Sequence, residues 1–325
     1  MFACPPIWQM DCSKLKVVLG YLSMNPTVFW SFAILALFVW MLFRPYSTAP
    51  WKILGFIAAL VAAEPFTIAA LRASSQAYPL KYDYVLQALD QALGLTAFQI
   101  ARLFTPWDRT ALFTIYQILV NAMVAWYGIH LVIRGGEPRK LLYAYLIVFL
   151  VGGCLYGVVP AMGPRYAFGA LFPMENPNVA PVPALLEGNP NAMPSLHVAT
   201  ALLLVLFTGR NRLLLPVAVL FLAGTVAATL ALEHYVIDLV VAVPFACFAA
   251  ELARGRMIPA IKYLGVVLAW LGLIRFASPE LVQYPLVLRL LAVFSVWLGA
   301  RAVAVQWKGP QEMTTGEPEA VLARP

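Results

Sequence analysis

The sequence predicts an all-α fold, a polytopic integral-membrane helical bundle with about nine spans. Two observations support this prediction. Hydrophobic residues make up 62% of the 325 residues and charged residues only 11%, against about 50% and about 25% in soluble domains. The apolar residues also gather in runs of about 20, the length that a helix needs to cross a bilayer core. The composition excludes a disordered chain, because disorder requires low hydrophobicity and many charges.

The apolar runs give the positions of the expected spans. Five stretches between charged residues contain no charge inside them, and these are 16–44, 109–134, 140–165, 187–210 and 212–233. Four further runs contain charged residues, and these are 52–72, 235–252, 261–276 and 285–305. Together they predict about nine membrane helices.

The basic residues predict how the bundle is oriented. The net charge of +7 comes from scattered residues rather than from clusters, which does not favour a nucleic-acid partner. Lys and Arg concentrate in the gaps on one side of the expected membrane, 44–52, 134–140, 209–213 and 253–262. Because basic loops stay in the cytoplasm, the long loops 73–108 and 161–194 are expected on the extracytoplasmic side.

The chain divides into four parts on this basis. We expect N-terminal membrane helices over 1–72, a catalytic core over 73–252, C-terminal membrane helices over 253–305 and a disordered tail over 306–325. Within the core, 80–104 has helical spacing of apolar residues, which predicts an amphipathic helix lying on the membrane.

Two of the three histidines lie at the start of expected spans, where polar residues are costly and therefore informative. His197 follows Pro-Ser-Leu, and His234 precedes Asp238 by four residues. Arg165 lies just after the end of another apolar run. The expected topology, which was built from other charges, places all of these groups at the extracytoplasmic face.

Each of these groups has a chemical interpretation. His234 and Asp238 are one helical turn apart, so the carboxylate can accept the imidazole N–H and orient the ring. Pro194 and Ser195 are typical of a helix start, whose free amides and hydroxyl can bind an anion. Arg165 provides a planar, permanently charged group suited to phosphate. The alternative is that each pair is only a helix-stabilising contact.

These motifs resemble those of the type 2 phosphatidic acid phosphatase (PAP2) superfamily and, within it, the inositol phosphorylceramide synthase-like branch. Residues 194–197 (Pro-Ser-Leu-His) match the second motif of the superfamily. His234 and Asp238 match the end of its third motif, with Tyr235 as in the synthase-like branch. Arg165 matches the arginine of its first motif.

The resemblance has gaps at the other cationic positions. The lysine of the first motif falls on Val158, and the proline that follows its arginine falls on Tyr166. The Ser-Arg pair that opens the third motif falls on Ala227 and Ala228. The synthase-like branch shares the loss of these two cations.

The resemblance implies the role of each group. His234 is the expected nucleophile, Asp238 its orienting partner and His197 the acid that protonates the leaving oxygen. Arg165 and Ser195 are expected to hold the phosphoryl oxygens. No metal or other cofactor is implied.

The expected activity is a lipid phosphotransferase that works through a phosphohistidine, with membrane lipids as donor and acceptor. The first alternative is a lipid phosphate or polyprenyl diphosphate phosphatase, in which water is the acceptor. A non-enzymatic transporter is the alternative of another class, although its polar residues would lie near the midplane of the membrane. Two histidines and an aspartate could also bind zinc.

Three further features stay open at the sequence level. Glu64, beside Pro65, is either an acid that faces the substrate or a paired or protonated group in the bundle. Arg72 could contact an anionic headgroup or only the lipid surface. Cys4 and Cys12 could form a disulfide if the N-terminus lies in an oxidising compartment.

Overall fold

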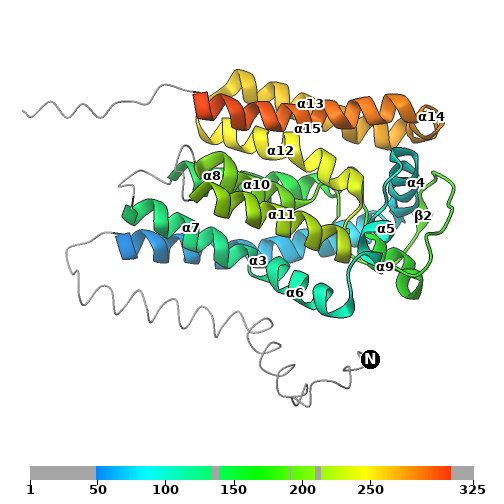
Figure 1. Ribbon diagram of the computed structural model, residues 1–325, viewed down its shortest axis with the longest axis horizontal. Coiled ribbons are helices and arrows are strands. Elements are labelled where there is room, and N and C mark those ends of the chain that lie inside the picture. Colours follow the sequence, from blue (N-terminus) through cyan, green and yellow to red (C-terminus); the bar gives the residue numbers. More distant parts are fainter. Residues whose placement is uncertain (1–48, 134–138, 191, 209–213, 309–325) are drawn as a thin grey trace, which may run out of the picture.

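The computed structural model describes residues 49–308 with three short gaps, at 134–138, 191 and 209–213 (Figure 1). The expected span 16–44, the cysteines Cys4 and Cys12, and residues 309–325 of the expected tail lie outside the described residues.

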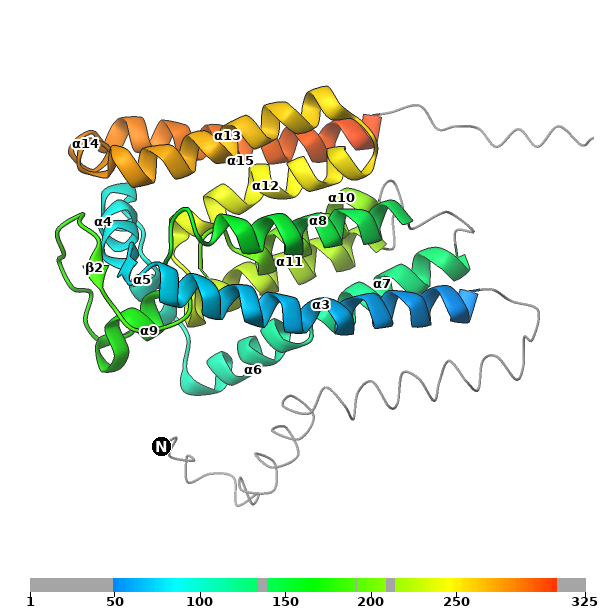
Figure 2. The ribbon, with the colours of Figure 1, turned by 180° about the vertical axis from the view of Figure 1, so that it is seen from behind.

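The described part is mostly helical, as the sequence predicts. Its long helices run side by side in one bundle (Figures 1 and 2). They are α3 (Ala49–Ala77), α6 (Pro106–Gln117), α7 (Leu119–Ile133), α8 (Arg139–Leu155), α10 (Leu196–Thr208), α11 (Leu214–Leu232), α12 (Val236–Ala253), α13 (Met257–Phe276) and α15 (Pro285–Lys308). Shorter elements gather at one end of the bundle. They are β1 (Leu80–Lys81), α4 (Asp83–Leu93), α5 (Ala97–Arg102), α9 (Pro164–Phe168), the 3₁₀ helix η1 (Gly169–Leu171), β2 (Ala184–Leu185) and α14 (Ser278–Gln283).

Four described helices are long and apolar enough to cross a membrane, namely α11, α12, α13 and Pro285–Val305 of α15. A fifth span is possible if Trp107–Gln117 and Asn121–Ile129, which meet at 54°, form one bent span. These helices indicate a multi-pass membrane protein.

The structure therefore does not show about nine spans. Uncharged runs proved longer than the helices inside them. The run 187–210 contains α10, whose 13 residues extend only about 20 Å. The run 140–165 contains α8, which ends at Leu155 before a non-helical segment. A run of sequence without charged residues can be a buried segment as well as a membrane span, because buried loops are also apolar.

α12 is the central helix of the described bundle. It packs against α8, α10, α13 and α15, and 78% of its residues are buried, against 28–33% in α11, α13 and α15. Its first turn is thus surrounded by protein on several sides. This position suits a reaction that must be kept away from bulk water.

Residues 80–104 do not form the single membrane-surface helix that their periodicity predicts. α4 ends at Gly94, which adopts a left-handed conformation, and Thr96 caps the start of α5 by accepting a hydrogen bond from the Gln99 amide at 3.2 Å. α4 packs against α12, α14 and α15, and its core-facing residues Val85, Leu86 and Leu89 are fully buried. The segment is therefore folded into the protein instead of lying along a lipid surface.

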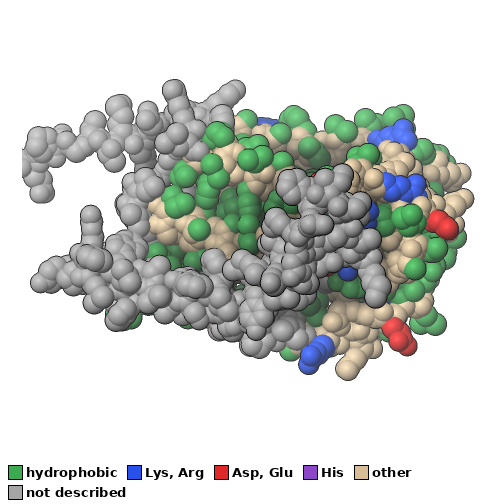
Figure 3. All heavy atoms as spheres, turned by 60° about the horizontal axis from the view of Figure 1, so that its bottom comes forward, with side chains coloured by type: hydrophobic (Ala, Val, Ile, Leu, Met, Phe, Trp, Pro, Cys, Tyr) green, Lys and Arg blue, Asp and Glu red, His purple; other side chains and the backbone are tan. Residues whose placement is uncertain are grey.

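The short elements cover the end of the bundle that contains the start of α12. β1 and β2 form an antiparallel pair in which Leu80 faces Leu185 and Lys81 faces Ala184. Among the described side chains visible in Figure 3, hydrophobic ones outnumber charged ones, and most of the charged ones lie toward the right-hand end, where Figure 1 shows α4, α9 and β2. This end is where the candidate site lies.

Candidate active site

The turn between α11 and α12 positions His234 and Asp238. α11 ends at Leu232, and α12 begins at Val236, so His234 lies in the connecting turn. The Asp238 side chain folds back and accepts a hydrogen bond from the Tyr235 amide at 2.9 Å. A carboxylate in the first turn satisfies a free amide and interacts favourably with the helix dipole. Asp238 therefore fixes the start of its own helix.

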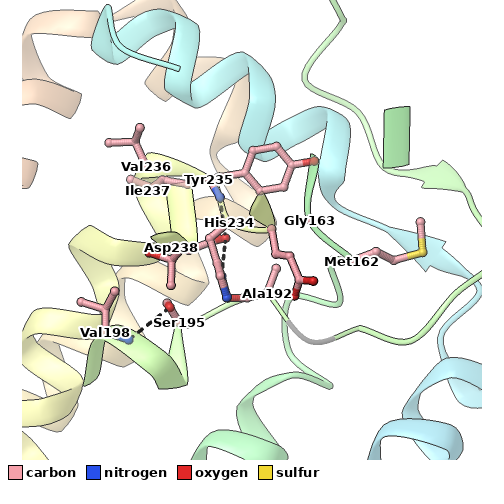
Figure 4. A network of polar contacts seen from close by, with 12 residues as sticks. Met162, Gly163, Ala192, Ser195, Val198, His234, Tyr235, Val236, Ile237 and Asp238 are labelled. Carbon is pink, nitrogen blue, oxygen red and sulfur yellow. Dashed lines mark hydrogen bonds and ion pairs between the residues drawn. The ribbon is translucent and has the colours of Figure 1, made fainter. Parts of the chain in front are cut away.

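His234 is oriented by two acceptors at one ring nitrogen. Its Nδ1 lies 3.1 Å from the Ala192 carbonyl oxygen and 3.4 Å from Asp238 Oδ2 (Figure 4). A carbonyl oxygen can only accept, so Nδ1 carries the proton and Nε2 keeps its lone pair. Burial lowers the pKa of His234 to about 4, although Glu233 and the Ala192 carbonyl act in the opposite direction. The ring is therefore neutral near pH 7.

The start of α10 lies directly beside this turn. Ser195 Oγ accepts a hydrogen bond from the Val198 amide at 3.4 Å, as the expected helix cap. The Ser195 amide lies 3.4 Å from the Asp238 carbonyl oxygen, which joins the two helix starts. In Figure 4, Ser195 lies beside Asp238. Ser195 and Asp238 are completely buried.

His197 faces His234 across the site. Their ring centroids are 5.9 Å apart, and the ring planes are inclined by 64°. The other face of His197 stacks on Tyr116 of α6, with centroids 3.8 Å apart and planes inclined by 23°. Stacking on Tyr116 therefore sets the orientation of the His197 ring.

Glu233 joins three elements next to the histidines. Its Oε2 accepts a hydrogen bond from the Tyr116 hydroxyl and its Oε1 one from the Tyr166 hydroxyl, both at 2.9 Å. Tyr116 belongs to α6 and Tyr166 to α9. This carboxylate thus fixes the ring on which His197 stacks. Burial, followed by the charge of Glu233, raises the pKa of Tyr166 to about 12.

Two buried carboxylates of α4 accept hydrogen bonds from the start of α12 and from the turn before it that carries His234. Asp90 Oδ2 accepts from the Val236 amide at 2.8 Å, and its Oδ1 accepts from the Ile237 amide at 3.0 Å. Asp83 Oδ1 accepts from the Tyr235 hydroxyl at 3.0 Å. The pKa of Asp90 is raised, and that of Asp83 is raised to about 6, in both cases mainly by burial and against the hydrogen bonds that they accept.

Asp83 also holds the loop that carries Arg165. Its Oδ1 accepts from the Gly163 amide at 2.8 Å, and both of its oxygens lie 3.1 Å from the Met162 amide. Gly163 has a positive φ of 99°, and a Cβ there would lie 1.9 Å from the Glu233 carbonyl oxygen. Only glycine permits the loop to pack this closely on the turn that precedes His234.

Arg165 lies beside the histidine pair instead of between the two rings. It is exposed and lines a pocket of about 440 Å³ together with Arg109 of α6 and Leu232 at the end of α11. A second pocket of about 160 Å³ is lined by His197, Tyr116 and a mixture of apolar and polar residues that includes Gln117 and Thr200.

The remaining predicted residues lie elsewhere. Tyr235 is fully buried and extends away from the His234 ring toward Asp83 (Figure 4). Arg72 is exposed in the last two turns of α3. Glu64 lies within α3, and its side chain is outside the described part of the structure.

Sequence reasoning missed the residues that support the histidines. Tyr116 and Glu233 carry no recognisable motif. Asp83 and Asp90 had a usable signal, because two acids seven residues apart lie on one face of a helix, in a stretch whose other residues are mostly apolar. The Ala192 carbonyl could not be found, because any residue provides one.

No group of three or more His, Cys, Asp or Glu side chains among the described residues is arranged to hold a metal ion. His197, His234 and Asp238, which the sequence allowed as possible zinc ligands, do not form such a group.

Comparison with known proteins supports a family assignment for this site. A family model described as the PAP2 superfamily matches residues 85–252. Comparisons with curated proteins and with solved structures gave no match. The matched region covers half of the chain and includes both histidines, Asp238, Ser195 and Arg165. The chain therefore belongs to the PAP2 superfamily, whose members are typically metal-independent phosphatases and phosphotransferases acting on lipid phosphates.

Proposed function

We propose that the protein is a lipid phosphotransferase that works through a phosphohistidine at His234 Nε2. The observation that carries this proposal is the orientation of His234. Its Nδ1 faces the Ala192 carbonyl oxygen at 3.1 Å and Asp238 at 3.4 Å, which leaves Nε2 unprotonated. A neutral imidazole with an oriented lone pair is a competent nucleophile toward phosphorus.

The proposed first step transfers the phosphoryl group to the enzyme. His234 Nε2 attacks phosphorus, the bond from phosphorus to the leaving oxygen breaks, and protonated His197 gives that oxygen a proton. Burial and His234 lower the pKa of His197 to about 3, so His197 gains this proton only when the negative phosphate lies beside it. Ser195, the amides at the start of α10 and Arg165 stabilise the phosphoryl oxygens. Asp238 stabilises the positive charge that develops on the His234 ring.

The second step reverses these roles. Neutral His197 takes the proton of an acceptor hydroxyl, whose oxygen attacks phosphorus while the bond from phosphorus to Nε2 breaks. His234 returns to its starting state. A lipid or polyol hydroxyl gives a transferase, and water gives a phosphatase.

Within the superfamily, we favour the inositol phosphorylceramide synthase-like branch. Tyr235 follows the nucleophile as in that branch, and Val158 and Ala228 replace the two missing cations. Ala228 is buried in a small apolar cluster with Leu112 and Tyr116 of α6. An arginine there would displace the tyrosine on which His197 stacks.

The proposal also includes the organisation and orientation of the chain. Residues 73–252 form the catalytic core between N-terminal and C-terminal membrane helices. The histidines face the extracytoplasmic side, because the basic gaps lie at the opposite ends of the helices.

Trapping of the phosphoenzyme tests the two histidine roles. The purified protein is exposed briefly to a labelled short-chain p-nitrophenyl phosphodiester, whose leaving group departs without a proton. Wild type and His197→Ala should both retain an acid-labile label, and His234→Ala should retain none. Asp238→Asn should label more slowly. Label in His234→Ala, or its loss in His197→Ala alone, would show that the roles are assigned wrongly.

Comparison of lipid extracts identifies the reaction with natural donors. Membranes that contain wild type are compared by mass spectrometry with membranes that contain His234→Ala. A new phospholipid that appears only with wild type supports the transferase. Loss of a lipid phosphate with release of inorganic phosphate would instead establish the phosphatase. Turnover by His197→Ala should fall by about 10²–10⁴ with a lipid donor, because a lipid alkoxide needs a proton to leave.

A further inference from the structure

A pocket of about 440 Å³ lies next to the histidines, between the first turns of α6 and the loop after α9. Arg109 and Thr110 line it from α6, and Arg165 lines it from α9. Ala231 and Leu232 line it from the last turn of α11, immediately before Glu233 and His234. The pocket is thus adjacent to the catalytic turn.

The charge of this pocket is unbalanced. Among the described residues, its lining contains two guanidinium groups and no carboxylate. The Arg109 Nε donates to the Phe104 carbonyl oxygen at 3.2 Å, which orients the guanidinium, and neither arginine forms an ion pair with any described residue. Two like charges that share one pocket are relieved by an anion that contacts both, and guanidinium groups suit phosphate oxygens.

The other walls are suited to hydrocarbon. Phe113 of α6 and Phe172 and Pro173 of the loop after α9 line the same pocket. Arg102 of α5 donates to the carbonyl oxygens of Pro173 and Met174, both at 2.7 Å, and so fixes this loop. A ligand that has an anionic group beside an apolar group complements such a lining.

The position of Arg109 separates this pocket from the reacting atoms. Arg109 and Tyr116 are seven residues apart on one face of α6, which places them about 10 Å apart along the helix axis. Tyr116 stacks on His197, with ring centroids 3.8 Å apart. The Arg109 side chain donates a hydrogen bond to the carbonyl oxygen of Phe104, which precedes α6. The side chain therefore points away from Tyr116. An anion held by Arg109 therefore lies roughly 10 Å from the histidines, a distance comparable to the length of a lipid headgroup.

We propose that this pocket captures the anionic phosphate headgroup of a membrane lipid before the phosphate reaches His234. This inference rests on the proposed function, since it assigns the class of lipid that the histidine site receives. Arg109, anchored by Phe104, holds the incoming phosphate. Arg165 is exposed, and no hydrogen bond of its side chain is seen among the described residues, so this side chain can accompany the phosphate to the histidines. The pocket selects lipids with net negative charge over zwitterionic lipids, because its described lining has two guanidinium groups and no carboxylate to pair with an ammonium group.

Direct lipid binding tests this inference independently of turnover. The His234→Ala protein is titrated in detergent with phosphatidylglycerol or with phosphatidylcholine of the same acyl chains, and bound lipid is counted by native mass spectrometry. Phosphatidylglycerol should bind more tightly. Adding Arg109→Gln should weaken its binding about 10-fold, the loss expected for one charge-assisted contact, and should leave phosphatidylcholine unchanged. Arg109→Lys should retain part of the preference.

A matched control removes a positive charge elsewhere. Lys262 is exposed near the start of α13, so Lys262→Gln should leave both affinities unchanged. An equal loss with Lys262→Gln would show that only the net charge matters and would overturn the site. Equal binding of the two lipids, or no effect of Arg109→Gln, would also overturn it.

Two further experiments are needed. One distinguishes a lipid headgroup from free phosphate as the bound anion, and the other distinguishes failure of the pocket proposal from failure of the phosphotransferase proposal. Inorganic phosphate at millimolar concentration should not displace phosphatidylglycerol, and displacement would overturn the lipid assignment. In the otherwise wild-type protein, Arg109→Gln should raise KM for an anionic lipid donor about 10-fold with kcat within about twofold, because a capture contact is not part of the transition state. A fall in kcat alone would place Arg109 in the phosphoryl site and overturn the capture role. A wild type that forms no phosphoenzyme yet binds lipid through Arg109 would contradict the proposed function and leave the pocket standing.

Discussion

At the scale of single residues, the two histidines are held in different ways. His234 is fixed by hydrogen bonds from Nδ1 to the Ala192 carbonyl oxygen and to Asp238. The face of the His197 ring rests on Tyr116, whose hydroxyl is held by Glu233. The proposed role of His197 requires its nitrogens to give and take protons, and orientation through the ring face leaves those nitrogens available.

Tyr116 should therefore matter for the steps that need His197. Tyr116→Leu removes the stacked ring, and we expect kcat with a lipid donor to fall about 10-fold, since such ring pairs contribute about 0.5–1.5 kcal/mol. Tyr116→Phe keeps the ring and should be much closer to wild type. Formation of the phosphoenzyme from the p-nitrophenyl phosphodiester should be unchanged in both variants. Equal loss with both donors would indicate general misfolding rather than a role in orienting His197.

The pH dependence of phosphoenzyme formation should reflect the lowered pKa of His234. Its pKa is lowered from 6.5 to about 4, chiefly by burial, so the ring is already neutral at pH 5.5. With the p-nitrophenyl phosphodiester, whose single charge does not titrate in this range, the rate should be constant from pH 5.5 to 8. It should decline only as the pH approaches 4, where the ring gains a proton. The burst of p-nitrophenolate is measured after an alkaline quench. A decline centred near pH 6.5 would contradict this prediction.

At the scale of elements, the start of α12 depends on a helix distant in sequence. Asp90 of α4 accepts hydrogen bonds from the Val236 and Ile237 amides, and Asp238 accepts one from Tyr235. Three of the amides that a helix start leaves free are thus satisfied by carboxylates. The α4 carboxylate keeps the first turn of α12 in place, and with it His234.

Asp90→Ala should destabilise the protein by about 2 kcal/mol, because two buried amides lose their acceptor. The loss is measured as a lower midpoint of thermal unfolding in detergent. Asp90→Asn should lose less, since its amide oxygen can still accept. Asp108 provides an exposed control, because its Oδ2 accepts a hydrogen bond from the Thr105 amide at the start of its own helix α6. If Asp108→Ala costs as much as Asp90→Ala, burial of the cap is not what gives Asp90 its importance.

At the scale of the whole molecule, the bundle has two chemically different ends. The histidine site, the β1–β2 pair and α4 lie at one end, and the connection between α12 and α13 lies at the other. That connection contains Arg254 and Arg256, which both pair with Glu251. The basic end is the one that charge bias predicts to be cytoplasmic.

Cysteine labelling tests this orientation. In a variant whose native cysteines are replaced by Ala, Val182→Cys adds a thiol at an exposed position of the long loop, and Met257→Cys adds one at the exposed start of α13. A thiol reagent that cannot cross membranes should label residue 182 in intact cells and residue 257 only after permeabilisation. The reverse pattern would invert the topology and place the histidines in the cytoplasm.

The sequence by itself determined the class of the protein and predicted the groups that we propose to react. Low charge and long apolar runs required a membrane environment. Two local patterns do not depend on the rest of the fold, namely the spacing of His234 and Asp238 and the Pro-Ser start before His197. A helical turn brings such residues together by its own geometry.

Only the tertiary structure decided how these groups are supported. Asp83 and Tyr235 are 152 positions apart, and Tyr116 and Glu233 are 117 positions apart. Contacts of this range depend on how the helices pack, which no local pattern encodes. The same reason explains why the described helices show four or five candidate spans and why 80–104 is two helices packed on the protein. An apolar residue is buried equally well by lipid or by a neighbouring helix. The packing of the helices determines which of the two covers it.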